Sequence, residues 1–303
     1  MPDIPYFDAH CDTVTTFRPL AENGGHLDLK RLRAYQGAAQ VFALWAPPGL
    51  DRPALFRRYL RRWEDELLRN GGSLAHCRSI SEARQAIAEG RVAAFLSVEG
   101  AGLLDCSVAG LCEAHRRGVR MVTLTWNRSN ALAGAAMDGG GGLTEAGRRF
   151  VAAAWELGVA VDLSHASEGT FWDVLRTAKR PVLCSHSDAR ALCDHPRNLT
   201  DAQIAALIHD GGCMGLNLYP EFLGGGDMDA VYAQIDHILC LDGRETLCLG
   251  GDWDGVEALP EGIGGVEDMA VLYEGLLRRN YSERLVRDIF FNNLVRFMEE
   301  AVG

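Results

Sequence analysis

The sequence predicts an α/β protein with a (β/α)8 fold, the TIM barrel. Three observations carry this prediction: eight short apolar runs alternate with amphipathic helical segments, the composition does not shift along the chain, and no Pro/Ser-rich linker divides it. The chain has 303 residues, and such a barrel usually needs about 250, with room for insertions. We therefore expect a single domain over residues 1–303. The alternative, an open doubly wound sheet, would need a Gly-rich dinucleotide turn after an early strand, and the sequence has none.

The expected strands are short apolar runs, each followed by a polar or glycine-containing turn. They lie at 4–7, 40–45, 92–98, 119–125, 159–163, 181–184, 213–218 and 246–249. The expected helices lie between them at 28–35, 51–70, 81–89, 106–117, 144–157, 167–178, 200–209 and 228–240, and two more close the chain at 266–279 and 282–299. Pro47-Pro48-Gly49 should end the second strand. Ser81 should cap its helix, because a side-chain oxygen there can accept from a free backbone N–H group.

Composition narrows the class of protein. Hydrophobic residues make up 48% and charged residues 23% of the chain, which is typical of a soluble globular protein. The net charge of −11 disfavours nucleic acid as a partner, since phosphate binding needs clustered Lys and Arg. The nine cysteines are odd in number and contain no CxxC pair, which indicates reduced thiols. No signal peptide and no apolar run near 20 residues is recognisable. We therefore expect no membrane contact and a cytoplasmic location.

Polar residues gather where the predicted strands end. His10 and Asp12 follow the first strand two residues apart, so their side chains should point to the same side. In a barrel the carboxyl ends of the strands converge on one rim, where the active sites of this architecture lie. Three histidines and three acids at this rim would be costly to bury without a cation between them, so they predict a metal site. The six residues are His10, Asp12, Glu99, His165, His186 and Asp252.

These residues are too many to be ligands of one catalytic tetrahedral ion that keeps a position open for water. They fit two ions about 3.5–4 Å apart that share a bridging carboxylate. In this arrangement one ion takes His10, Asp12 and Glu99, and the other takes Glu99, His165 and His186. Imidazole and carboxylate ligands without thiolate suit zinc best, with manganese, iron or cobalt as alternatives.

A water held between two such ions would be largely hydroxide near neutral pH. Asp252 is then free to accept its proton and pass it to a leaving amine. Asp254 is a second candidate for this role. We prefer Asp252, because it directly follows the strand and a pair of glycines, while Asp254 can brace the loop. The other histidines are expected to be ordinary surface or capping residues: His26, His76, His115, His195, His209 and His237.

The segments that contain these residues resemble the membrane (renal) dipeptidase family, the zinc dipeptidases of the amidohydrolase superfamily (peptidase family M19). They span nearly the whole chain in family order, and no single segment carries the resemblance. The matching segments are Asp8-Ala9-His10-Cys11-Asp12, Val98-Glu99-Gly100, Leu124-Thr125-Trp126-Asn127, Gly142-Leu143-Thr144, Val161-Asp162-Leu163-Ser164-His165-Ala166-Ser167, Ser185-His186-Ser187, Pro196-Arg197-Asn198-Leu199, Gly250-Gly251-Asp252-Trp253-Asp254-Gly255 and Asn292-Asn293-Leu294-Val295-Arg296.

The resemblance implies a binuclear zinc barrel that hydrolyses dipeptides, often with a D-residue at the C-terminal position, by attack of a metal-bridging hydroxide. By position, Asp252 resembles the catalytic acid/base. Arg197 resembles the residue that binds the terminal carboxylate of the dipeptide, where a guanidinium suits a bidentate contact. The residues that resemble the metal ligands are His10, Asp12, Glu99, His165 and His186.

Trp126 is the one departure that bears on chemistry. Relatives similar to the renal enzyme have a histidine at this position, thought to touch the scissile carbonyl oxygen. An indole can donate one hydrogen bond but cannot take up a proton. We therefore expect Trp126 to contact the substrate while stabilisation of the oxyanion rests more on the metals.

Two alternatives to a dipeptidase stay open at this point. The first is an amidohydrolase acting on another small amide or ester, such as an N-acyl amino acid or a lactone, and Trp126 motivates it. The second is a catalytically silent barrel that binds a ligand or a partner. For the dipeptidase the expected partner is a small dipeptide, and a homodimer is left open as the assembly.

Overall fold

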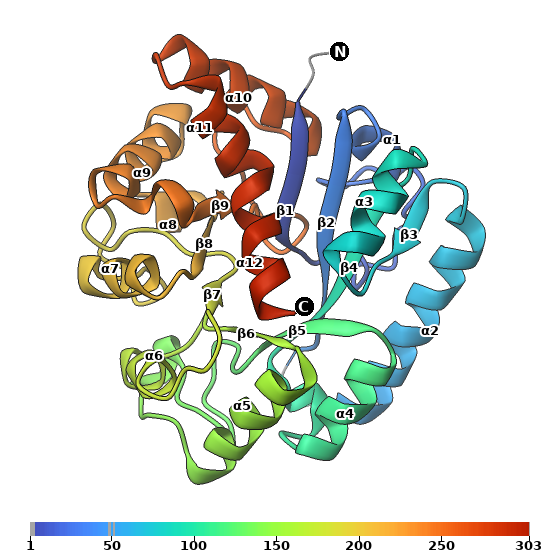
Figure 1. Cartoon of the computed structure of the whole chain (residues 1–303), viewed down its shortest axis with the longest axis vertical. Coiled ribbons are helices and arrows are strands. Elements are labelled where there is room, and N and C mark those ends of the chain that lie inside the picture. The colour runs from blue at the N-terminus through green and yellow to red at the C-terminus, as the bar shows by residue number, and fades with distance from the viewer. Residues whose placement is uncertain (1–3, 48–49, 51, 303) are drawn as a thin grey trace.

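The computed structural model describes residues 4–47, 50 and 52–302, and its central strands form a closed parallel barrel surrounded by helices (Figure 1). The barrel closes because β9 pairs with β1 through Asp8 and Leu249, and β2 pairs with β4 along its length. The predicted (β/α)8 fold is confirmed, and each barrel strand overlaps one predicted apolar run. In order around the barrel the strands are β1 (Pro5–Cys11), β2 (Gly37–Trp45), β4 (Val92–Glu99), β5 (Val119–Thr123), β6 (Ala160–Asp162), β7 (Leu183–Cys184), β8 (Cys213–Leu216) and β9 (Leu247–Leu249).

A further strand, β3 (Leu74–His76), was absent from the predicted set. It pairs in parallel with the first half of β4, where Leu74 lies opposite Val92 and His76 opposite Ala94. Three residues are too few to show the alternation that marks a strand in sequence. For this reason β3 is visible only in the folded chain.

Helices cover the outside of the barrel, and the predicted helices are found within a few residues of their expected ends (Figure 1). The helix predicted at 282–299 differs in that it is interrupted by a π-helical segment at Asp288–Asn292. The predicted helix start at Asp51 and the predicted strand end at Pro48-Gly49 lie outside the described residues. The α-helices are α1 (Leu29–Leu32), α2 (Arg52–Asn70), α3 (Ile80–Ala88), α4 (Val108–Arg116), α5 (Glu145–Leu157), α6 (Glu168–Leu175), α7 (Asp201–His209), α8 (Pro220–Leu223), α9 (Met228–Cys240), α10 (Met269–Arg278), α11 (Glu283–Arg287) and α12 (Asn293–Ala301).

The predicted cap of α3 is wrong by two residues. Ser79, and not Ser81, has the extended backbone of a cap (φ −149°, ψ 163°), and its side chain accepts a hydrogen bond from the backbone N–H of Glu82. The earlier start makes Ile80 the first helical residue, and its side chain is buried in the apolar cluster at the base of the barrel. Burial of an apolar residue therefore decides between two serines that are equally good caps by type.

The amino-terminal end of the barrel is closed by apolar packing. Leu294 and Phe297 of α12 pack in one buried cluster with Phe7 and Phe95, which come from β1 and β4. The rings of Phe7 and Phe95 stack with centroids 5.6 Å apart. In Figure 1, α12 lies across this end of the strands. The amino-terminal end of the barrel is therefore filled by apolar side chains. Within the described ranges, every helix is too short or too polar to cross a bilayer.

Candidate metal centre and active site

The six predicted rim residues lie together at the carboxyl end of the barrel, although up to 242 positions separate them in the chain. Each is at most 8% exposed. Their donor atoms form two overlapping groups, in each of which all atoms lie within 4.8 Å of one another. The first group is His10, Glu99 and His186, and the second is His10, Asp12 and Asp252. The predicted convergence of distant strand ends is therefore found.

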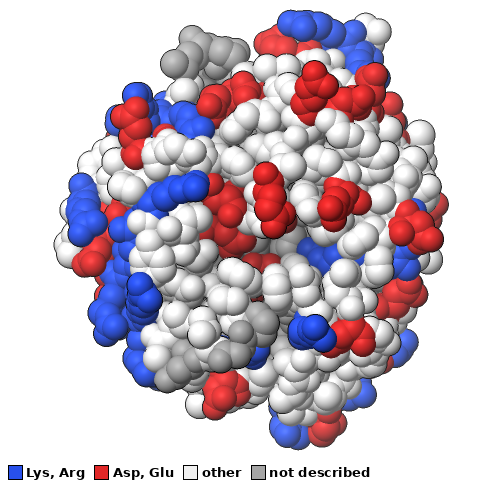
Figure 2. Space-filling view, turned by 180° about the vertical axis from the view of Figure 1, so that it is seen from behind, with Lys and Arg blue, Asp and Glu red and all other residues white. Residues whose placement is uncertain are grey.

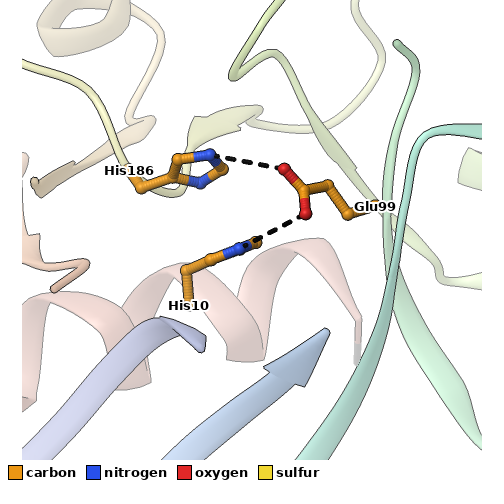
Figure 3. Close-up of side chains that lie close together, drawn as sticks. All are labelled: His10, Glu99 and His186. Carbon is orange, nitrogen blue, oxygen red and sulfur yellow. Dashed lines mark ion pairs between the residues drawn. The ribbon is translucent and has the colours of Figure 1, made fainter. Parts of the chain in front are cut away.

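Glu99 turns one carboxylate oxygen toward His10 and the other toward His186 (Figure 3). Its Oε2 is 3.7 Å from His10 Nε2. Its Oε1 is 2.8 Å from His165 Nε2 and 3.7 Å from His186 Nε2. The carboxylate thus presents one oxygen to each side of the cluster, which is the arrangement that a carboxylate shared by two cations requires.

The loops after two strands turn sharply to aim their side chains at the cluster. His165 and Asp252 have left-handed backbones, with φ of 66° and 56°. For residues other than glycine this conformation costs about 1–2 kcal/mol, so surrounding contacts must hold it. Asn127 Oδ1 lies 2.8 Å from His165 Nδ1, and Asn217 Nδ2 donates to Asp252 Oδ2 at 3.1 Å. These contacts hold the two side chains from the back, away from the cluster.

Asp8, to which the sequence assigned no role, anchors His10. It is fully buried, and its Oδ1 accepts from the backbone N–H of His10 at 2.9 Å and from Gln40 Nε2 at 3.0 Å. Its Oδ2 accepts from the backbone N–H of Gly251 at 2.8 Å. One carboxylate therefore ties β1, β2 and the turn after β9 together beneath the cluster.

The electrostatics of the cluster fit a bound cation. His10 Nε2 and Asp12 Oδ1 are buried without a hydrogen-bond partner among the described residues. Burial raises the pKa of Glu99 well above its usual value, and the neighbouring charge of Asp12 raises it further. Burial also lowers the pKa of His165 far below its usual value. Buried acids beside unprotonated imidazoles are stable when a metal ion offsets their charge, so the donor set fits divalent metal ions.

The surroundings of His10 also favour positive charge, although its pKa is shifted in the opposite direction to that of His165. Burial alone would lower its pKa, but the carboxylates of Glu99, Asp12 and Asp252 raise it to about 10. Its Nε2 is 3.9 Å from Asp12 Oδ2 and 3.9 Å from Asp252 Oδ1. The three acids therefore create a position at which a cation is strongly favoured.

Asp252 and Asp254 have different surroundings. Asp252 Oδ1 faces the cluster, whereas both oxygens of Asp254 are used by the loops around it. Thr13 Oγ1 donates to Asp254 Oδ2 at 2.7 Å, and the backbone N–H of His26 donates to Asp254 Oδ1 at 2.8 Å. Asp254 thus braces the loop, and Asp252 is the one of the two that belongs to the cluster.

A pocket of about 510 Å³ opens above the cluster. Arg197 lines it, is only 4% exposed, and its Nη1 is buried with no hydrogen-bond partner among the described residues. Its guanidinium lies 5.4 Å from the centre of the Phe222 ring. A buried guanidinium with a free N–H group is suited to an anionic part of a ligand. Figure 2 shows the face opposite α12, where acidic side chains gather around a central hollow.

Trp126 forms part of the pocket wall beside the cluster. Its ring centroid is 5.1 Å from that of Trp45 and 6.2 Å from that of His165. Trp45 was not predicted as a pocket residue, because it ends a strand that carries no predicted ligand. The two indoles therefore present an apolar surface on one side of the histidines.

Three of the remaining histidines differ from the surface or capping residues that were expected. His195 lines the pocket, accepts from the backbone N–H of Arg197 at 3.2 Å and packs on Phe222 with ring centroids 4.6 Å apart. His26 Nδ1 accepts from the backbone N–H of Asp254 at 3.1 Å. His76 belongs to β3. These roles depend on loop contacts across the fold, which local sequence does not reveal.

Comparison with known proteins identifies relatives over the whole chain. The family model described as membrane dipeptidase (peptidase family M19) matches residues 1–302. An uncharacterized protein in the pqqA 5′ region of Klebsiella pneumoniae is 30% identical over 247 residues, which cover 77% of this chain and 90% of that protein.

Two solved structures are similar along the full length. One is a metallo peptidase from Rhodobacter sphaeroides liganded with a phosphinate mimic of the dipeptide L-Ala-D-Ala, with 28% identity, a TM-score of 0.89 and coverage of 99% of this chain and 100% of that chain. The other is the dipeptidase AC, a metallo peptidase of family M19, with 29% identity, a TM-score of 0.90 and coverage of 100% of both chains.

Proposed function

Because the chain belongs to the membrane dipeptidase family (peptidase family M19) and is a metal-dependent hydrolase, we propose that it hydrolyses dipeptides with two divalent metal ions. The observation that carries this proposal is the position of Glu99. One of its oxygens faces His10, and the other faces His165 and His186. A carboxylate placed between two sets of ligands is the natural bridge of a two-metal site.

In this proposal one ion is held by His10, Asp12 and Glu99, and the other by Glu99, His165 and His186. The two groups of donor atoms contain imidazole nitrogens and carboxylate oxygens and no cysteine. This donor set favours zinc over the harder cations magnesium and calcium, which prefer oxygen alone.

When bound, such ions supply Lewis-acid chemistry, in which the pKa of water falls and a peptide carbonyl is polarised. Asp252 would accept the proton from the attacking water and deliver it to the leaving amine. Asn217 already occupies Oδ2 of this carboxylate, so Oδ1 on the side of the cluster is the atom that carries the proton.

The substrate would be fixed at its other end by Arg197, whose free N–H group can hold the terminal carboxylate of a dipeptide. Trp126 would contact the substrate beside His165, and since an indole cannot take up a proton it acts there only as a wall or a single donor. The Rhodobacter sphaeroides relative is liganded with a mimic of L-Ala-D-Ala. We infer the same class, an L-residue followed by a D-residue, for this chain.

The test combines metal counting with a substrate panel. Metal-free protein is titrated with Zn²⁺, and the loaded enzyme is assayed on L-Ala-D-Ala, L-Ala-L-Ala, N-acetyl-alanine and a tripeptide. We expect two bound ions per chain, turnover of the dipeptides, and a loss of about 10²–10⁴-fold in kcat for Asp252→Asn with metal retained. Bound metal without turnover of any dipeptide would contradict the proposal, and turnover of N-acetyl-alanine alone would favour the broader amidohydrolase function.

A further inference from the structure

We propose that Asp162 and Ser185 form a relay that fixes the tautomer of His186 and thereby makes its Nε2 a metal ligand. The proposal rests on the metal centre proposed above, but neither residue is a ligand in it. Asp162 ends β6, Ser185 follows β7, and both are fully buried. They act through His186 and are therefore positioning residues.

The hydrogen bonds of Asp162 connect three neighbouring strands. Its Oδ1 accepts from the backbone N–H groups of Ser164 and Ser185, both at 2.9 Å. Its Oδ2 accepts from the hydroxyls of Thr123 and Ser185, both at 2.7 Å. Ser185 Oγ in turn lies 2.7 Å from His186 Nδ1. The carboxylate, the hydroxyl and the imidazole thus form one continuous chain.

Counting hydrogens along this chain settles the direction of each bond. Asp162 accepts in all four of its hydrogen bonds, and a serine hydroxyl has one hydrogen to give. The short bond to a charged acceptor takes that hydrogen, because charge-assisted bonds are the stronger ones. Ser185 Oγ must then accept from His186 Nδ1–H. In a neutral imidazole this leaves Nε2 with a free lone pair.

The free lone pair points at the cluster. His186 Nε2 lies 3.7 Å from Glu99 Oε1 and 3.0 Å from His165 Nε2. His165 is held separately, through its Nδ1 by Asn127. Partners of this kind, which fix the orientation and tautomer of a ligating histidine, typically change metal affinity by about 10–100-fold when they are removed. Here a hydroxyl is interposed between the carboxylate and the histidine.

Asp162→Asn tests the relay with almost no change in volume. The amide of the new side chain can donate to Ser185 Oγ. The Ser185 hydroxyl is then free to donate to His186 Nδ1, and in a neutral ring the hydrogen is then found on Nε2. Ser185→Ala removes the hydroxyl and breaks the chain. Ser164→Ala is the matched control, because Ser164 is buried and accepts from the backbone N–H of His186 at 3.1 Å. Its hydroxyl also lies 3.3 Å from Ser185 Oγ, but it does not stand between Asp162 and His186, so its loss leaves the hydrogen bonds that link those two residues in place.

The first readout is ¹⁵N NMR of the histidine rings in the metal-free protein, which reports the tautomer directly. The second is Zn²⁺ affinity measured by competition with a chelator, with thermal unfolding to verify the fold. We expect the Nδ1–H tautomer in the wild type and in Ser164→Ala, and the Nε2–H tautomer in Asp162→Asn. Affinity for one of the two ions should fall about 10–100-fold in Asp162→Asn and Ser185→Ala.

Three results would overturn the relay. One is an unchanged tautomer and an affinity within twofold of wild type in Asp162→Asn, and another is an equal loss in Ser164→Ala. The third, which decides the matter if Asp162→Asn does not fold, is an unchanged affinity in Ser185→Ala. If the wild type binds no metal, both the proposed function and the relay are rejected. If the wild type binds two ions and Asp162→Asn has the same tautomer and the same Zn²⁺ affinity, the relay alone is rejected.

Discussion

Gly255 offers a direct way to disturb the candidate site without disturbing the barrel. It follows Asp254 in the loop after β9 and is exposed. A Cβ atom added at this position would lie 2.3 Å from Asp252 Oδ1 and 2.5 Å from Asp12 Oδ2. Gly255 does not have a left-handed backbone, so Gly255→Ala introduces no backbone strain. Its whole effect therefore falls on the two carboxylates.

The distances allow the size of this effect to be worked out. Ordinary van der Waals contact of a Cβ atom begins at 3.4 Å, so each carboxylate oxygen must retreat by about 1 Å. Both oxygens are at the ends of side chains and can shift without movement of the backbone, so we expect the free energy of unfolding to change by less than about 1 kcal/mol. A displacement of about 1 Å in a catalytic group typically costs about 10²-fold in rate. Gly255→Ala should accordingly lose about 10²-fold in kcat/KM.

The assay is dipeptide hydrolysis by zinc-loaded protein, with metal content and thermal unfolding measured on the same samples. Gly24→Ala is the matched control, since a Cβ at Gly24 meets no atom within 4 Å. The control should keep wild-type activity. If Gly255→Ala retains activity within about threefold, the carboxylates of Asp12 and Asp252 do not take part as argued, and the reasoning from their positions fails.

Three further predictions follow from the pocket, the metal centre and β3. Arg197→Met should raise KM for L-Ala-D-Ala about 10–100-fold, because a hydrogen bond to a charged group contributes about 1.5–3 kcal/mol. Steady-state kinetics should show no such effect on the C-terminal amide of the same dipeptide. An equal effect on both substrates would contradict the binding of the terminal carboxylate by Arg197. Removal of metal with a chelator should abolish hydrolysis and lower the unfolding temperature, since Asp12 and Glu99 then repel each other inside the protein. Addition of zinc should restore both the activity and the unfolding temperature. Activity that persists in verified metal-free protein would exclude the metal-dependent mechanism. Burial lowers the pKa of His76 to about 4, below the usual value of about 6.5 for the unfolded chain, so its contribution to stability is complete above about pH 6.5 and is lost as the pH falls toward 4, by up to about 3 kcal/mol. Urea unfolding at pH 7 and pH 5 should show a loss of stability in the wild type that is absent from His76→Gln. Identical losses in the two proteins would refute this reasoning.

The fold was predictable because each barrel strand is a buried apolar run bounded by turn residues. Parallel strands covered on both sides need continuous hydrophobic residues, and this signal survives even for β7, whose ladder is only two residues long. The elements that were missed, β3 and α8, have three and four residues, which is shorter than any periodicity can mark. The cap of α3 was misplaced because Ser79 and Ser81 are equally good caps by residue type. The start at Ser79 makes Ile80 the first helical residue, whose side chain is buried, and only the folded structure shows this.

The candidate ligands were predictable for a different reason, namely that parallel strand ends meet at one rim. Knowing that a residue ends a strand is enough to place it there. What sequence could not supply is the hydrogen bonding behind the ligands. Asn127 and Asn217 lie in loops after other strands, and nothing in their local sequence indicates that they hold His165 and Asp252. Their roles depend on distances across the barrel.

Two buried carboxylates explain why the ligands are held so firmly. Asp8 joins β1, β2 and the turn after β9, and Asp162 joins the ends of β5, β6 and β7. Each accepts a backbone N–H two residues further along the chain, from His10 and Ser164 respectively. Each carboxylate therefore anchors the backbone at a candidate ligand or directly before one, since Ser164 precedes His165. Buried carboxylates are stable only when their hydrogen-bond partners are in place. The positions of Asp8 and Asp162 are therefore set by the barrel, and through them the barrel orders the neighbouring ligands before any metal binds.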